Sequence, residues 1–586
     1  MDLNRYFSTR RKHPHDHHHP HEPTQRKRLP LIASPINKDA LHAVSSSSSS
    51  DLEKVSSDGT STTAQTLTTS DKSSANPVIY KTHHEASTIE LFYDLFFVAN
   101  LAYFTTLINY LKLFTLMWFT WLSTTLFDVR FGIDSVWNRL CKAVQFGAFT
   151  GFVFAGPVFD NADKSDDAKS YKHFAIVMAV SRFVIALQYF VVTVQGRLFR
   201  QTLLPVGLSG VVHLCSAVGF LVTYFVFPVG DLTLSRFIFT IVEGLAIFLI
   251  AMVWRVVSFK YTHLVERCQL LTLIIIGEGI IGMVKSVSCI FKGQATNNST
   301  EMGTVVAAVL LLYLMWMLYF DQLSHDRFGT VRQQLWSLLH YPLHVAILLC
   351  VEGNTSLIVW NSAVQALKWT WDIEPANYSD PAANFGSTDA YISYLNDTMY
   401  DVNARFKSKA WNATYDWNKN FTAIRNYTDV YGFRTPEWNT RTANVTRMMF
   451  NYAQVFVFEA HADTLAKISA VTSPTANARM KLDGIFDVFN VTVLQFYIGA
   501  GAMLLLLAIM YWFNKLHKTK YEFGEMINRV VVGFGLIIAG VAVVLVNKKT
   551  SGFKFAASNW IIPIVVISFI LGTSFFLLIA GVSYKA

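Results

Sequence analysis

Residues 261–282 read YTHLVERCQLLTLIIIGEGIIG, an apolar stretch from which the rest of the chain can be interpreted. The stretch predicts a helix that crosses a membrane, with His263, Glu266 and Arg267 at its N-terminal end and Glu278 in its middle. At about 1.5 Å per residue, Glu278 lies roughly 20 Å from the start of the span, near the bilayer midplane. A charge at that depth costs several kcal/mol unless it is paired or hydrated, so Glu278 is a candidate functional residue.

The same stretch has an ordered arrangement around its axis. At about 100° per residue, His263, Arg267 and Glu278 share one face of the expected helix, while Glu266 points aside. Three glycines surround the buried acid: Gly277, Gly279 and Gly282. We therefore expect a neighbouring helix to approach closely at this point.

The composition places the chain among polytopic membrane proteins. Of its 586 residues, 52% are apolar and only 15% are charged, and the mean hydropathy is +0.32. The net charge of +9 is spread over a basic N-terminal segment and short loops, which indicates cytoplasmic anchoring and no nucleic-acid partner. The five cysteines show neither a CxxC nor a Cys/His zinc spacing, so we expect no disulfide framework, metal or cofactor.

The chain divides into four parts by composition. Residues 1–85 contain His/Pro and Ser/Thr-rich tracts without an apolar leader, which predicts a disordered cytoplasmic tail. Residues 86–360 carry nine apolar spans, and residues 491–586 carry three more. Between them, residues 361–490 form an insertion rich in Asn, Thr, Tyr and Trp without a catalytic signature. We expect this insertion to form a small, mostly helical, glycosylated cap outside the membrane.

The predicted fold class is an all-α polytopic membrane protein with about twelve transmembrane helices. The expected spans lie near 88–108, 113–128, 142–159, 173–194, 202–227, 236–254, 264–288, 302–320, 335–360, 491–513, 529–547 and 560–582. The second and third of these are short for a full crossing.

Two features predict that the N-terminus lies in the cytoplasm. The connections assigned to the inner side carry more Lys and Arg than the short outer connections. The N-x-[ST] sequons all fall on the outer side, and eight of them are candidate glycosylation sites: Asn297, Asn298, Asn377, Asn396, Asn412, Asn420, Asn426 and Asn444. Two more, Asn354 and Asn490, lie too near the membrane. We therefore expect a protein of the secretory pathway, in the plasma membrane rather than the vacuole.

Ionisable residues inside the spans fall at two depths. One group gathers near the cytoplasmic boundary: Glu90, Asp94, Arg130, Asp134, His263, Glu266, Arg267, Asp321, His325 and His340. The other lies near the midplane: Arg182, Glu243, Glu278 and His344. Carboxylates and imidazoles exchange protons and arginine holds their pKa values apart, so the arrangement is typical of a proton relay or cation path. The alternative is that Arg182 pairs permanently with Glu243 or Glu278 and only sets helix packing.

A metal site is a weaker interpretation of the same residues. His340 and His344 lie one turn apart and could bind a metal together with Asp321. No tight third-ligand motif accompanies them, so we expect no metal. P-loop, G-x-S-x-G, HExxH and dinucleotide-binding motifs are also missing from the sequence.

Five segments, in their order and spacing, resemble the bacterial low temperature requirement protein A family: STIELFYDLFFVANLA, FDVRFGIDSVWNRL, THLVERCQLLTLIIIGEGIIG, LYFDQLSH and HYPLHVAI. The resemblance covers about 88–360. The resemblance implies that ten residues of this chain stand at the family's motif positions: Glu90, Asp94, Arg130, Arg182, His263, Glu266, Arg267, Glu278, Asp321 and His344. The chain has one Trp316 where the family commonly has a tryptophan pair. The tail and the insertion look like a eukaryotic elaboration of fungal type. The resemblance implies an architecture and no settled activity.

Three classes of function are compatible with these patterns. Our leading hypothesis is a transporter or channel that moves protons, a cation or a proton-coupled solute past the buried acids. An intramembrane enzyme would instead act on a lipid-type substrate, with Glu266, His263 or Asp94 as acid or base. A sensor or scaffold would depend on the tail and the cap. The expected partners are the lipid bilayer and a small ion or solute.

Overall fold

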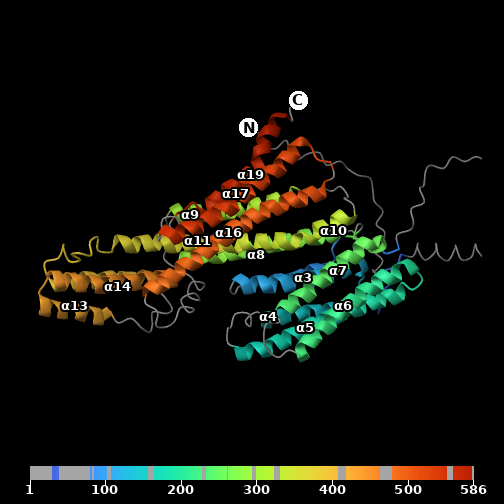
Figure 1. Cartoon of the computed structure of the whole chain (residues 1–586), viewed down its shortest axis with the longest axis horizontal. Coiled ribbons are helices and arrows are strands. Elements are labelled where there is room, and N and C mark those ends of the chain that lie inside the picture. Colours follow the sequence, from blue (N-terminus) through green and yellow to red (C-terminus); the bar gives the residue numbers. More distant parts are fainter. Residues whose placement is uncertain are drawn as a thin grey trace, which may run out of the picture.

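The structure of the chain, a computed structural model, consists of helices and their connections (Figure 1). It describes residues 30–37, 79–81, 85–101, 107–155, 164–226, 233–259, 262–292, 299–322, 330–406, 417–461, 478–515, 517–550 and 558–583. Within these ranges, the one β-type pairing is an isolated antiparallel bridge between Ile36 and Tyr80. The predicted all-α fold class is confirmed.

The helices follow the expected order of spans. The first nine segments of the bundle are α2 (Thr88–Leu101), α3 (Leu107–Phe131), α4 (Val136–Ala155), α5 (Lys164–Gln195), α6 (Arg200–Val226), α7 (Thr233–Val253), α8 (Leu264–Lys292), α9 (Ser299–Phe320) and the pair α10 (Thr330–Leu338) and α11 (His340–Asp372). The insertion and the last segments are α12 (Thr388–Arg405), α13 (Trp417–Tyr431), α14 (Pro436–His461), α16 (Ala478–Asn514), α17 (Lys520–Thr550) and α19 (Ile561–Ser583). A short 3-10 turn, η2 (Arg255–Val257), follows α7.

Seven helical segments in the described ranges are long and apolar enough to cross a membrane. They are His173–Gln195, Arg200–Phe225, Leu264–Ser288, Ser299–Phe320, Val331–Asp372, Phe486–Asn514 and Lys520–Val546. Two shorter apolar segments, in α7 and α19, match two further expected spans. Length and composition thus support seven of the twelve predicted spans. The first three are not among the seven: the described part of α2 has only 14 residues, α3 carries several Thr, Trp and charged residues, and α4 carries Asn138, Arg139, Lys142 and Gln145.

The expected spans near 113–128 and 142–159 correspond to longer helices. α3 has 25 residues and α4 has 20, so at about 1.5 Å per residue they measure roughly 37 and 30 Å. Neither helix is apolar enough over that length to count among the seven crossing segments, so the expectation that these two spans are short for a crossing stays a prediction.

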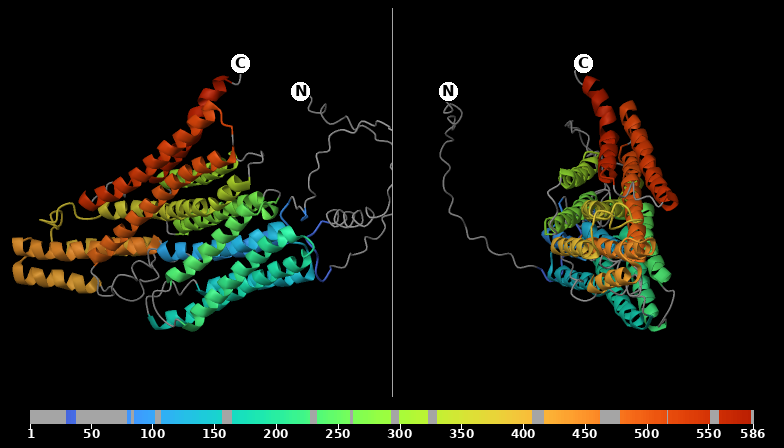
Figure 2. Two further views of the ribbon diagram at one scale, coloured as in Figure 1. Left: turned by 45° about the vertical axis from the view of Figure 1, so that its right-hand side comes forward. Right: turned by 90° about the vertical axis from the view of Figure 1, so that its left-hand side faces the viewer.

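One hydrophobic core runs through the bundle and includes the last three helices. α3 packs against α2, α4, α5, α7 and α8, so it lies inside the first half of the bundle. α11 packs against α8, α9 and α16, and α16 in turn packs against α17 and α19. Figure 2 shows the resulting arrangement from two sides, with α17 and α19 inclined to the other helices.

The insertion forms a second hydrophobic cluster beyond one end of the bundle. α11 has 33 residues, about 50 Å, and its last turns enter the cluster together with α12, α13 and α14 (Figure 1). Trp438 is fully buried there, and its Nε1 donates to Thr428 Oγ1 at 2.8 Å. The apolar run 450–458 lies in α14 and buries Phe450, Ala453 and Val457.

Part of the predicted tail is packed against the bundle. Residues 30–37, which we call the N-terminal strap, pair with residues 79–81 through Asn37 N to Ile79 O at 2.8 Å and Lys81 N to Pro35 O at 2.9 Å. This differs from the expectation of a wholly disordered tail. The His/Pro run 13–21, the basic residues 26–28 and the Ser tract 45–50 lie outside the described residues.

Candidate functional site

α3 carries polar groups on two of its faces, although every one of its residues from 113 to 131 is buried. The hydroxyls of Thr120 and Thr124 donate to carbonyls one turn earlier, at 2.7 and 3.2 Å, which satisfies them within the helix. At about 100° per residue, Trp118 and Trp121 point away from Thr120. α3 therefore presents polar groups to two different sets of helices.

The first set joins α2, α3 and α8, and we call its five residues the acid–arginine cluster. Asp94 Oδ1 accepts hydrogen bonds from Trp121 Nε1 and Arg267 Nη2, both at 2.8 Å. His263 Nε2 lies 2.9 Å from Glu90 Oε2, and Arg267 Nη1 lies 3.8 Å from the same oxygen. All five side chains are buried. The structure thus brings four of the predicted site residues together with an unpredicted tryptophan.

A second buried ion pair adjoins this cluster. Lys142 Nζ on α4 binds Asp128 Oδ2 on α3. The same ammonium lies 4.5 Å from the centre of the Tyr93 ring and is within electrostatic range of Glu90 and Asp94. Three carboxylates, one arginine, one lysine and one histidine therefore share a single buried region.

The other side of α3 faces a second cluster, formed with α5, α6 and α7, which we call the Glu243 cluster. Glu243 lies 3.1 Å from Arg182 Nε and 3.1 Å from His213 Nδ1. Ser123 Oγ donates to Glu243 Oε1 at 2.6 Å, and Ser216 Oγ donates to Oε2. The carboxylate and both of its basic neighbours have at most 1% of their side-chain surface exposed. Glu243 is therefore the partner of Arg182.

Glu278 lies apart from both clusters. It is buried, but its electrostatic neighbours among the described residues are Lys285, Glu352 and Tyr110. Arg182 thus pairs with Glu243 and not with Glu278, the other partner that the sequence allowed. The depth of a residue in its span could not show which of the two acids faces Arg182.

The glycines beside Glu278 pack α8 against α11. A Cβ added to Gly279 would lie 2.3 Å from Val351 Cγ1, and one added to Gly282 would lie 3.0 Å from Thr355 Oγ1. A Cβ on Gly277 would meet nothing within 4 Å. Two of the three glycines therefore permit the close helix approach that was expected from the sequence.

His344 links α11 to α3 and α8. Its Nδ1 accepts from Trp118 Nε1 at 3.0 Å, because an indole nitrogen only donates. Its Nε2 lies 2.8 Å from Thr272 Oγ1, whose own proton is donated to Cys268 O at 2.9 Å. The pattern assigns the proton to Nε2 and leaves the imidazole neutral.

His340 is engaged in the same way one turn earlier. Its Nδ1 lies 3.0 Å from Trp336 O and its Nε2 lies 2.8 Å from Tyr319 Oη. The ring nitrogens of both histidines therefore point at different partners and do not converge on a metal. Asp321 is exposed, His325 lies outside the described residues, and no group of three metal-ligating side chains occurs in the described part of the chain.

Two other predicted residues lie at the edge of this arrangement. Glu266 is half-buried and has no hydrogen bond or ion pair with the residues of either cluster within the described ranges. Arg130 is buried at the end of α3, with its guanidinium 3.9 Å from the centre of the Phe259 ring. Neither joins the acid–arginine cluster or the Glu243 cluster.

Several buried polar atoms in the clusters have no hydrogen-bond partner among the described residues. They are Asp94 Oδ2, Arg182 Nη2, Arg267 Nε and Nη1, and both ring nitrogens of His213. His213 Nδ1 is close to Glu243 but does not have hydrogen-bond geometry. Within this set, Asp94 Oδ2 and the His213 ring can take up a proton, whereas the arginine nitrogens can only donate to an acceptor.

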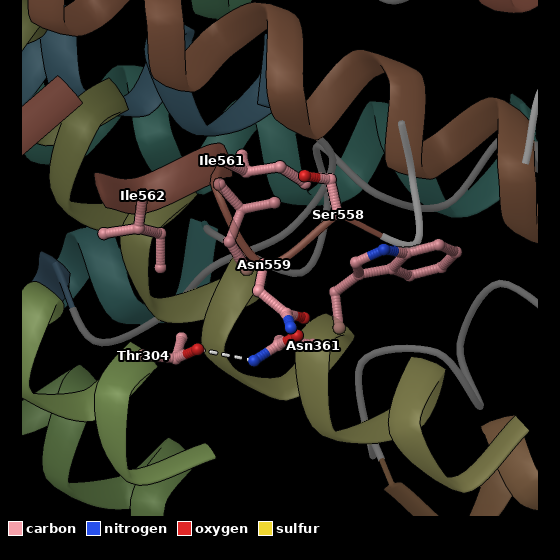
Figure 3. Close-up of a pocket in the computed structure, with 8 residues that line it drawn as sticks. Thr304, Asn361, Ser558, Asn559, Ile561 and Ile562 are labelled. Carbon is pink, nitrogen blue, oxygen red and sulfur yellow. Dashed lines mark hydrogen bonds between the residues drawn. The ribbon is translucent and has the colours of Figure 1, made fainter. Parts of the chain in front are cut away.

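A small cavity lies elsewhere, between α9, α11 and the start of α19 (Figure 3). Its free space is about 10 Å³, and its walls include Thr304, Asn361, Ser558 and Asn559. Asn361 Nδ2 donates to Thr304 Oγ1 at 2.5 Å. This space is enough for about one water molecule, so the cavity does not hold a solute.

Sequence reasoning missed the residues that surround the predicted ones. The missed set is Trp118, Thr120, Trp121, Ser123, Asp128, Lys142, His213 and Ser216. The signal was present in the run LMWFTWLSTTLFD, which is unusually rich in hydroxyl and indole groups for a buried helix. A histidine in the middle of LSGVVHLCSAV was a second such signal.

Comparison with protein families gives a match that covers the part of the chain containing both clusters. The family described as Bacterial low temperature requirement A protein (LtrA) matches residues 85–369. The comparisons with curated proteins and with solved structures gave no match. The matched region contains α2 to α10, most of α11, both clusters and Glu278. The match over residues 85–369 supports the assignment of this region to the low temperature requirement A family.

Proposed function

We propose that this integral membrane protein moves protons, or a cation or solute coupled to protons, along the polar surfaces of α3. The observation that carries the proposal is the set of unpaired atoms inside otherwise paired clusters, above all Asp94 Oδ2. Asp94 Oδ1 already accepts from Trp121 and Arg267. Its second oxygen can therefore take a proton without breaking either bond.

The two clusters provide groups of the kind that exchange protons. Glu90 and His263 form a carboxylate–imidazole pair, and Glu243 and His213 form another, on opposite sides of α3. Arg182 and Arg267 keep one positive charge beside each carboxylate set. Because each cluster joins several helices, a change in its charge changes the forces between those helices.

The same geometry favours transport over catalysis on a lipid. His263 and Asp94, the proposed acid or base of such an enzyme, are buried and held in ion pairs. Glu266 is only half-buried and has no hydrogen bond or ion pair with the acid–arginine cluster among the described residues. The observed contacts support exchange of protons between fixed groups.

For the membrane arrangement, we propose twelve crossings with the N-terminus in the cytoplasm, in the plasma membrane. The insertion 361–490 then lies outside the cytoplasm. Four of its sequons have exposed side chains that are available for glycosylation: Asn377, Asn396, Asn426 and Asn444. Asn420 is buried, whereas Asn297, Asn298 and Asn412 lie outside the described residues. Removal of glycans by an endoglycosidase should lower the apparent mass of the wild-type protein on gels. The apparent mass of a variant with Gln at the four exposed sequons should change less.

The test of the proposed function is proton flux in liposomes that contain the purified protein. Asp94→Asn keeps the side-chain shape, and Arg267 retains Glu90 at 3.8 Å, so we expect the variant to fold. Its flux under a pH gradient should fall to that of empty vesicles. The matched control is Glu266→Gln, which removes an acid from the same region of α8 and should keep the wild-type flux.

Two results would contradict the proposal. Wild-type flux no higher than that of empty vesicles, with each candidate cation supplied in turn, would rule out transport. Equal flux in wild type and Asp94→Asn would show that the acid–arginine cluster only holds helices together.

A further inference from the structure

Arg130 is a buried cation without a carboxylate. It is the penultimate residue of α3 and is only 6% exposed. Its guanidinium lies over the ring of Phe259 at 3.9 Å and 5.6 Å from the ring centre of Phe131. Its Nε and Nη2 atoms have no hydrogen-bond partner in the part of the chain that the structure describes.

The other buried arginines of the described residues are different. Arg182 and Arg267 lie 3.1 and 2.8 Å from carboxylate oxygens, and Arg529 binds Glu525 and Gln322. The acid nearest to Arg130 in sequence, Asp128, is bound by Lys142. An unpaired buried charge is costly, and the Nε–Nη2 edge is the edge with which arginine binds two oxygens of one oxyanion.

A second buried donor lies near Arg130, on a ring 5.9 Å between centres from that of Phe131. Tyr189 is 1% exposed, its hydroxyl also has no partner among the described residues, and it is within electrostatic range of Arg130. Its ring is held by Phe127 at 5.1 Å between centres and by His213 at 5.3 Å. The hydroxyl position is therefore set by packing that does not depend on the oxygen itself.

The N-terminal strap covers this end of the bundle, opposite α13 and α14 (Figure 2). Tyr80, which is bridged to Ile36, packs its ring 5.1 Å from that of Phe131 and is within electrostatic range of Arg130. Burial raises the pKa of Tyr80, so its phenol stays protonated. The strap carbonyls at positions 30 and 31 accept the first two amides of α4, at 3.2 and 3.0 Å. These bonds give two free helix amides partners and fix the strap over α3 and α4.

We propose that Arg130 and Tyr189 bind a phosphate-type oxyanion under the N-terminal strap. The guanidinium edge supplies two parallel donors and the phenol a third, which matches a tetrahedral anion with several acceptor oxygens. The anion is either inorganic phosphate or the phosphate of a lipid headgroup. A headgroup is a candidate because Arg130 lies at the end of α3, which is also the end of the bundle. The strap must move for either to enter. The site adjoins the Glu243 cluster through the contact between the Tyr189 and His213 rings, but it uses none of the ion pairs of the proposed proton path.

The test uses the full chain in lipid nanodiscs, with the thermal midpoint as readout. One arm adds inorganic phosphate to discs of phosphatidylcholine alone. The other adds phosphatidylinositol phosphate to the discs and no phosphate to the buffer. We compare wild type with Arg130→Gln, Tyr189→Phe and Arg139→Gln. Arg139 is the matched control because it is an exposed arginine at the same end, already bound to Asp134.

We expect one of the two anions to raise the midpoint of wild type and of Arg139→Gln. The rise should vanish in Arg130→Gln, and Tyr189→Phe should need about tenfold more anion for the same rise, as for the loss of one hydrogen bond to a charge. A response to phosphate alone identifies the free anion, and a response to the lipid alone identifies the headgroup. No rise with either anion, or an equal rise in Arg130→Gln, would overturn the proposal.

Two additions keep the test decisive. If Arg130→Gln does not fold, Tyr189→Phe carries the test, because it removes one oxygen and keeps the ring. Ile36→Asp should weaken the strap and increase the rate of anion binding several-fold, and an unchanged rate would show that the strap does not cover the site.

Discussion

Replacing Glu243 with Gln should destabilise the protein by about 3–5 kcal/mol, because it leaves the Arg182 charge without a carboxylate in a fully enclosed site. The glutamine keeps the size of the side chain and still accepts from hydroxyls. The cost therefore comes from the charge. By contrast, Ser123→Ala removes one hydrogen bond to Glu243 and should cost about 0.6 kcal/mol, which is typical of a hydrogen bond between membrane helices.

The assay is the free energy of unfolding in mixed micelles, followed by helix content as the denaturing detergent increases. The double variant Glu243→Gln/Arg182→Gln removes both charges together. It should lose less stability than the sum of the two single variants, with a coupling of about 0.5–3 kcal/mol. If Glu243→Gln costs no more than Ser123→Ala, charge pairing does not stabilise the Glu243 cluster and the reasoning fails.

Three further predictions concern packing. Gly279→Val should lower stability by about 1–3 kcal/mol in the same assay, because its Cβ would collide with α11, whereas Gly277→Val should have little effect; equal losses would contradict the close contact. Trp438→Ala should lower the stability of the insertion by about 3–5 kcal/mol, so that a lower protease concentration cuts the insertion while the melting temperature of the bundle stays the same. A loss of stability in both the insertion and the bundle would show that they unfold as one cooperative unit. Ile36→Asp should speed hydrogen exchange at the first amides of α4, and unchanged exchange would exclude the strap as their partner.

Patterns within one helix could be predicted from the sequence. Glu90 and Asp94 are four residues apart, and a helix of 3.6 residues per turn places them on one face whatever surrounds it. The same holds for His263 and Arg267, and these four residues do meet in the structure. The glycines around Glu278 likewise pack against another helix, because small residues are the main sequence signal for a close approach.

Pairing between helices could not be predicted in the same way. The sequence offered Glu243 and Glu278 equally as partners of Arg182, because it shows depth and not the rotation and tilt of each helix. The structure places Glu243 beside Arg182 and Glu278 beside α11. The seven clear spans are the segments that are both long and apolar enough to cross a membrane. α3, the helix at the centre of the site, is not among them because of the polar residues that it contributes.

The central claim is that a buried acid of the acid–arginine cluster takes up and releases a proton. Infrared difference spectroscopy of the protein in membranes measures this directly, by stepping the pH between about 5 and about 8 and recording the carboxyl band. The account predicts a titrating band in wild type and in Glu266→Gln that is missing in Asp94→Asn. A wild-type spectrum without such a band, or one that Asp94→Asn leaves unchanged, would contradict it.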